Sequence, residues 1–197
     1  MAIYNWPEPL RPSQMSMALV SNSRVFRGKF SGAAQTASTP GTRWRITLTF
    51  NNLNDEESRL LEAMFVKLDG MANRIKCRDF GRDGAAPKGT PKVSVAGQMG
   101  VNLTTNGWTP GATVLRLGDY FVVGGELKMA TADITANSSG VATLQFGPPL
   151  RRSPALNSAI DTVNTWSNFM LTENENGVDR EPAFNNNITF TLEEDIV

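Results

Sequence analysis

Three short stretches of this sequence decide its fold: residues 92–98 (KVSVAGQ), 118–128 (GDYFVVGGELK) and 140–146 (GVATLQF). Each is rich in residue types that favour strands, and each contains the glycine that is typical of turns between strands. Gly124-Gly125 divides the middle stretch into two apolar halves, which is a strong signal for a β-hairpin. Prolines flank the region on both sides. The sequence therefore predicts a small, OB-like β-barrel over residues 89–151.

The segments on either side of this barrel belong together, because neither has enough strands for a domain of its own. Residues 43–50 (RWRITLTF) alternate between apolar and polar, which predicts a strand with one buried face. Residues 54–70 predict a helix with an asparagine N-cap, acidic residues in the first turn and an apolar stripe. We therefore predict a mainly β protein, in which a β-sandwich with one helix is split between residues 1–88 and 152–197.

The composition excludes most kinds of enzyme active site. The chain of 197 residues contains no histidine, which excludes Ser-His-Asp and Cys-His arrangements and His-based metal sites. Its single cysteine, Cys77, allows no intrachain disulfide, and its place in the strand-like run 74–80 predicts a buried core residue. We therefore expect a protein that is not an enzyme, with no catalytic, cofactor-binding or metal-binding residues.

The charge is balanced, with 19 basic and 19 acidic residues. This balance argues against a domain that binds nucleic acid, which usually carries a basic surface. The one basic cluster, Arg74, Lys76, Arg78 and Arg82, is diluted by two aspartates. The acidic residues 193–195 have the oxygen ligands that a divalent cation needs, but we favour a solvated tail. No apolar run is long enough to span a membrane, and we expect no secretory signal.

The first 23 residues are polar and rich in proline, which predicts an extended arm with little regular structure. Trp6 in this arm has two interpretations: packing on its own domain, which we favour, or docking onto a neighbouring subunit. Arg43 and Arg45 lie on the polar face of a predicted strand, where they meet water or a partner. All three are candidate subunit-interface residues, and we expect the fold to survive removal of residues 1–12.

Three further positions at the ends of the barrel are candidate contact sites. Trp108, in the run NGWTP, is expected in an exposed loop, where it either stacks on a sugar ring or closes one end of the barrel. We favour closure of the barrel and keep Trp108 and Tyr120 as candidate glycan contacts. Arg151-Arg152 follow the barrel directly, and a hinge, a subunit contact and a solvated loop all remain open for them.

The order of these segments and the barrel motifs resemble the distal tail proteins (Dit) of bacteriophages with long, non-contractile tails (siphophages). The motifs are Ala-Gly-Gln-x-Gly at residues 96–100, Gly-Asp-x-Phe at 118–121 and Pro-x-Leu at 148–150, with Gly-Trp-Thr-Pro at 107–110. The resemblance covers most of the chain. Because the motif residues belong to turns and strands, they indicate an architecture rather than a chemical activity.

This resemblance implies a virion structural protein at the distal end of the tail, assembled in the cytoplasm of the bacterial host. In this family the split domain forms a homohexamer ring that joins the tail tube protein to the tail-tip or baseplate hub protein. The lumen of the ring continues the channel through which DNA passes without sequence-specific binding, and the barrel projects outward. The alternatives are a tail tube or other minor tail protein, and a carbohydrate-binding or host-adhesion module.

Overall fold

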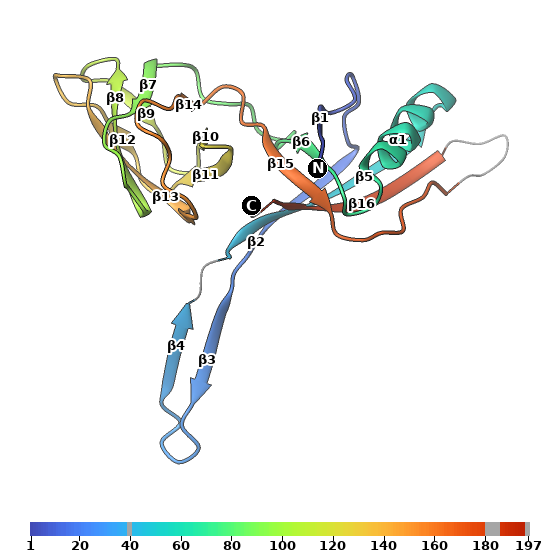
Figure 1. Cartoon of the computed structure of the whole chain (residues 1–197), viewed down its shortest axis with the longest axis horizontal. Helices are drawn as coiled ribbons and strands as arrows, with labels where there is room; N and C mark the ends of the chain where they lie inside the picture. Colours follow the sequence, from blue (N-terminus) through green and yellow to red (C-terminus); the bar gives the residue numbers. More distant parts are fainter. Residues whose placement is uncertain (39–40, 180–185, 196–197) are drawn as a thin grey trace.

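A computed structural model describes residues 1–38, 41–179 and 186–195, and it confirms a mainly β protein with a β-sandwich-like part and a small barrel (Figure 1). Residues 180–185 and 196–197 of the predicted segment 152–197 lie outside the described residues. The main sheet has six strands, in the order β1 (Ile3–Tyr4), β6 (Arg74–Cys77), β15 (Ser167–Leu171), β16 (Asn186–Glu194), β5 (Arg43–Leu53) and β2 (Gln14–Val20).

The main sheet forms because its central strands alternate as the sequence predicts. In β5 the side chains of Trp44, Ile46, Leu48 and Phe50 are buried, and those of β16 continue the same apolar layer. Helix α1 (Asp55–Leu68) covers this layer, and its Phe65 ring meets Phe190 edge-on at 5.1 Å. The helix begins with the expected cap, since the Asn54 side chain accepts a hydrogen bond from the Glu57 amide and the Glu57 carboxylate accepts one from the Asn54 amide.

The N-terminal segment is part of the main sheet, so the prediction of an arm with little regular structure is wrong. β1 pairs with β6, and β2 pairs with β5 along its whole length. The Trp6 ring is only 4% exposed, and its indole nitrogen donates to the Leu10 carbonyl at 2.9 Å. Residues 1–12 supply β1 and the buried side chains of Trp6 and Leu10, so we now expect their removal to destabilise the fold, against the expectation from the sequence.

The second sheet curls into a nearly closed barrel. Its strands follow the order β14 (Ile160–Asp161), β10 (Tyr120–Val123), β11 (Glu126–Ala130), β13 (Ala142–Leu150), β8 (Gly100–Trp108) and β7 (Gly89–Val93), and β9 (Thr113–Leu115) pairs with β12 (Ile134–Thr135) beside it. The predicted hairpin at Gly124-Gly125 is confirmed, with both glycines at positive φ. Backbone hydrogen bonds between Val93 and residues 157 and 158 bring the two edges together. The barrel sheet thus extends beyond the predicted boundary at residue 151.

A long hairpin leaves the main sheet at its β2–β5 edge. It consists of β3 (Ser23–Arg27) and β4 (Ala34–Ser38), which pair with each other, and Figure 1 shows it projecting away from both domains. The hairpin is placed by the β2–β5 pair, because β2 leads into β3 and β4 leads back into β5.

Candidate functional site: the exposed hairpin and the domain joint

The hairpin presents large apolar side chains directly to solvent. Phe26 is 59% exposed and Phe30, in the tip loop, is 100% exposed. The loop is fixed by its own backbone, since the amide of Gly28 donates to the Ala33 carbonyl at 2.9 Å and that of Gly32 to the Gly28 carbonyl at 2.9 Å. A two-stranded hairpin with no third strand is only marginally stable in water. Exposed aromatic residues on such an element are typical of an interaction surface.

The hairpin is also basic. Arg24, Arg27 and Lys29 lie on it, and the sequence from 21 to 42 contains no aspartate or glutamate. Successive strand residues point to opposite faces, so Arg24 and Phe26 share one face, while Val25 and Arg27 share the other. Both faces of the hairpin therefore combine one apolar and one cationic side chain.

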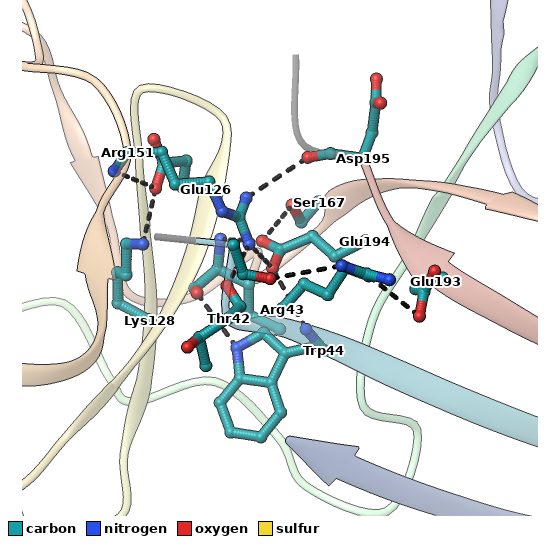
Figure 2. Close-up of polar contacts among 12 residues, drawn as sticks. Thr42, Arg43, Trp44, Glu126, Lys128, Arg151, Ser167, Glu193, Glu194 and Asp195 are labelled. Atoms are coloured by element: carbon teal, nitrogen blue, oxygen red, sulfur yellow. Dashed lines mark hydrogen bonds and ion pairs between the residues drawn. The ribbon is translucent and has the colours of Figure 1, made fainter. Parts of the chain in front are cut away.

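The barrel is held against the main sheet by one buried carboxylate, that of Glu194 at the end of β16 (Figure 2). Glu194 is 1% exposed. One of its oxygens accepts from the backbone amide of Leu127 in the barrel at 3.0 Å, and the other accepts from Arg151 Nη2 at 2.5 Å and from the Trp44 amide at 3.3 Å. A single carboxylate thus binds groups from both domains.

Arg151 adds further contacts across this joint. Its Nη2 donates to the Thr42 carbonyl at 3.1 Å, and its Nη1 donates to the Asp195 carbonyl at 3.3 Å. The planar guanidinium suits such a role because it presents several donors in a fixed fork. None of the three interpretations left open for Arg151-Arg152 included a contact between the domains of one chain, which Arg151 makes, whereas Arg152 is exposed.

Direct packing continues the joint on its other side. The indole nitrogen of Trp44 donates to the Leu127 carbonyl at 3.1 Å, and the Trp44 ring meets Tyr120 edge-on at 5.8 Å. Ser167 Oγ donates to the Gly125 carbonyl at 2.7 Å. These contacts hold the barrel hairpin β10–β11 on β5 and β15. They give the barrel one fixed orientation on the main sheet.

A buried lysine lies beside the joint. Lys128 Nζ pairs with the Glu126 carboxylate at 2.6 Å and donates to the Pro149 carbonyl at 2.9 Å. Burial lowers the pKa of Lys128, and the hydrogen bond and charge of Glu126 act in the opposite direction. Both partners come from the barrel, so this pair stabilises the strand that faces the joint.

The acidic residues 193–195 do not form a solvated tail, and that prediction is wrong. Glu193 pairs with Arg43 at 2.9 Å and with Arg45 at 2.8 Å. Asp195 pairs with Arg74 at 3.0 Å, and Glu194 forms the joint. Burial alone would raise the pKa of Glu193, but the hydrogen bonds and charges of the two arginines outweigh it and hold that pKa below its usual value.

The signal for this arrangement was present in the sequence. Period-two alternation buries Ile188, Phe190 and Leu192, and the same phase places Glu194 on the buried face. A carboxylate at a core position needs a cationic partner and hydrogen-bond donors. The partner, Arg151, lies 43 residues away in the sequence, and no spacing rule connects the two.

The candidate interface residues occupy two different environments. Trp6 packs in its own domain, with Phe80 at 4.9 Å between ring centroids, so its favoured interpretation is confirmed and its ring is not available to a neighbouring subunit. Arg43 and Arg45 are partly exposed but tied to Glu193. Their polar strand face also carries paired threonines, with Thr47 Oγ1 3.1 Å from Thr191 Oγ1.

The candidate glycan contacts are buried. Trp108 ends strand β8 inside the barrel core, and its indole nitrogen donates to Thr105 Oγ1 at 2.7 Å. The predicted exposed position of Trp108 is therefore wrong. The favoured interpretation, in which this ring closes one end of the barrel, fits its burial. Tyr120 is buried against Trp44, and its hydroxyl lies 3.4 Å from the sulfur of Met17. Burial raises the pKa of Tyr120. Neither ring offers a free face to a sugar.

The predicted basic cluster does not form one surface. Arg74 pairs with Asp195, Arg78 stacks over the rings of Phe80 and Trp166, and Arg82 lies over the Tyr120 ring and donates to the Gly118 carbonyl. Aromatic faces attract such guanidinium groups. These arginines are therefore used in contacts within the chain.

A cleft of about 460 Å³ lies between the N-terminal segment and the barrel. It is lined by Trp6 and Trp166, by Val122 of β10, and by polar residues that include Lys76 and Asp161. Oδ1 of Asp161 accepts from the backbone amides of residues 163 and 164, at 2.9 and 2.8 Å, which fixes the loop at the rim. Trp166 is half-buried, and no sequence signal pointed to it.

Reactive and metal-binding groups do not converge anywhere in the described residues. No group of three histidine, cysteine or acidic side chains within the described ranges has the geometry to hold a metal ion. Cys77 is buried as predicted, and burial raises its pKa far above the usual value for a thiol. In the same part of the chain, no helix has the length and apolar character needed to cross a membrane.

No family model matches this chain. A search of curated proteins likewise finds no match.

Proposed function

We propose that this chain is a self-assembling structural subunit of a bacteriophage tail: the distal tail ring subunit of a phage with a long, non-contractile tail. The observation that carries the proposal is the β3–β4 hairpin, which projects from the main sheet with exposed aromatic and basic side chains. A monomer gains nothing from such an element, whereas a subunit that contacts a neighbour through two different surfaces can close into a ring.

The joint supports the same proposal. A ring that connects two parts of a tail must hold its outer domain at a constant angle in each copy. The buried Glu194–Arg151 pair and the Trp44–Leu127 hydrogen bond support such a constant angle. The barrel then projects in one direction from each subunit, as the resemblance to distal tail proteins implies.

The proposed partners follow from this position. They are further copies of the chain, six in a ring, the tail tube protein on one side and the tail-tip or baseplate hub protein on the other. DNA would pass through the lumen without sequence-specific contacts. The polar face of β5 and β16, with its paired threonines and ion-paired arginines, has the hydrophilic character that such a lumen needs.

Immunogold electron microscopy of purified phage particles tests this function directly, with an antibody raised against the recombinant chain. Label confined to the distal end of the tail is the expected result. Label along the whole tail would make the chain a tube protein instead. Particles without any label would contradict a virion role.

A second candidate, carbohydrate binding for host adhesion, is favoured by one observation: the cleft beside Trp166. Clefts of this size at domain boundaries often bind small ligands, and a tryptophan ring with nearby amide and carboxylate groups suits a sugar. The test is a glycan-binding array with the full chain and with Trp166→Ala. Binding that depends on Trp166 would support this candidate, and the absence of glycan binding by the full chain would remove it.

A further inference from the structure

A shallow groove of about 350 Å³ lies at the opposite side of the main sheet from the hairpin. It runs between helix α1 and the segment 173–179, and it is lined by Phe65, Val66 and Val178 together with Glu62, Asn176 and Gly177. Val66 is 80% exposed, although it is a large apolar residue on the helix. The segment is anchored to the end of the helix, because Asn174 Oδ1 accepts from the Met71 amide at 3.2 Å.

The segment 173–179, which lines one side of this groove through its residues 176–178, is an acidic rim. Glu173, Glu175 and Asp179 are exposed, and the sequence from 172 to 179 contains no lysine or arginine. On the helix side, Arg59 is already paired with Asp55 at 2.5 Å. The groove therefore combines apolar lining residues with an acidic segment along one side.

The hairpin has the complementary chemistry. It carries three basic residues and no acidic residue, and the ring of Phe30 lies fully exposed at its tip. We propose that the hairpin tip of one copy docks into the α1 groove of a second copy, with Phe30 against Val66 and with Arg27 and Lys29 facing the acidic rim. This inference rests on the proposed assembly function and names the pair of surfaces that performs it.

The geometry of the chain favours contact between copies. Figure 1 shows the hairpin and α1 on opposite sides of the main sheet, so the tip of a hairpin does not reach the groove of its own chain. The two surfaces differ, and repetition of such a head-to-tail contact produces a closed ring or a filament. The groove is small, about the lower limit of ~300 Å³ for ligand sites, which suits one aromatic side chain and its neighbours.

Charge reversal with rescue tests this pairing in the full chain. One variant carries Arg24→Glu, Arg27→Glu and Lys29→Glu, a second carries Glu173→Lys, Glu175→Lys and Asp179→Lys, and a third carries all six changes. The matched control reverses three exposed basic residues in or next to the barrel: Lys88→Glu, Lys92→Glu and Arg116→Glu. Circular dichroism and thermal melting confirm that each variant folds, since every altered side chain is exposed.

Sedimentation equilibrium at low salt gives the readout. Like charges across an interface are strongly unfavourable, so each single-surface reversal should weaken self-association by at least ~100-fold. In the variant with all six changes the charges on the two surfaces are again opposite, so its self-association constant should return to within about tenfold of that of the original chain. The control variant should have the same self-association constant as the original chain. Reversals without effect, or six changes without rescue, would overturn the pairing.

A second measurement locates the contact independently. Phe30 is replaced by the photoreactive p-benzoylphenylalanine, and equal amounts of isotope-labelled and unlabelled chain are irradiated together. Mass spectrometry should find the photoreactive residue at position 30 cross-linked to a peptide of the other copy that contains Val66 or Val178. Cross-links to another surface of a second copy would overturn the pairing but leave the ring proposal intact. A chain that stays monomeric would overturn the pairing, while immunogold labelling decides the tail position separately.

Discussion

The chain contains two β-hairpins that both carry phenylalanine and valine in their first strand but lie in opposite environments. The barrel hairpin, β10–β11, buries most of its side chains, including Phe121. The projecting hairpin, β3–β4, exposes every side chain described in it, including Phe26. One is held by strands on both sides and by the joint, whereas the other has only its own two strands. The comparison shows that the projecting hairpin carries apolar side chains that its own chain does not bury.

Substitution in the barrel hairpin should give the largest loss of stability. Phe121 is fully buried and meets Phe146 edge-on at 5.5 Å, so Phe121→Ala should lower the free energy of unfolding by about 3–5 kcal/mol through the cavity that it leaves. Urea unfolding followed by tryptophan fluorescence measures this change. A loss below about 1 kcal/mol would mean that the barrel core can collapse around the missing ring.

The joint should give the next largest effect. Arg151→Lys keeps the charge but loses the fork that binds Glu194, Thr42 and Asp195, and we expect a loss of about 2 kcal/mol in unfolding free energy. The control is the exposed neighbour, Arg152→Lys, which should change stability by less than about 0.5 kcal/mol. Equal effects of the two substitutions would contradict the assignment of Arg151 to the joint.

Acid pH should weaken the pairing of β16 with β5, because it protonates the Glu193 carboxylate. Because its pKa is lowered in the folded state, the unfolded chain binds this proton more readily, and the stability from the Arg43 and Arg45 pairs is lost as pH falls through the folded pKa. The window lies below the ordinary glutamate value of 4.5. Glu193→Gln should remove about 1 kcal/mol at pH 7 and less at low pH, in unfolding curves recorded across this range. A difference between the two proteins that does not depend on pH would contradict this ionic role.

Substitution in the projecting hairpin should give the smallest effect on folding. Phe30→Ala removes a ring that contacts only solvent in the single chain, so the unfolding free energy should change by less than about 0.5 kcal/mol. The same urea measurement as for Phe121→Ala checks this expectation under conditions where the chain is monomeric. A loss as large as that at Phe121 would show that the hairpin packs on its own domain.

The sequence predicted the parts of this fold that depend on local pattern. The alternation in 43–50, the cap at Asn54 and the glycine pair at 124–125 each fix an element through nearby residues, and all three are confirmed. The N-terminal strands were missed because β2 is an edge strand with only partly buried side chains, so its alternation is weak.

Exposure and long-range pairing could not be predicted in the same way. The stretch 24–27 (RVFR) has the β-forming residues of a core strand, and only the absence of a third strand leaves it in solvent. Trp108 follows a glycine and lies two residues before a proline, which is typical of a loop, but the barrel closes around it. The Arg151–Glu194 joint depends on the way the two domains meet, which no local pattern records.

The most direct test of the central claim is the mass of the chain in solution with and without its hairpin. Residues 24–37 are replaced by a short Gly-Ser turn, and gel filtration with light scattering compares the shortened and original chains over a wide concentration range. The account predicts that the original chain forms a closed oligomer of fixed mass and that the shortened chain stays a folded monomer with a cooperative melting transition. Oligomers of equal mass and stability from both chains would contradict it.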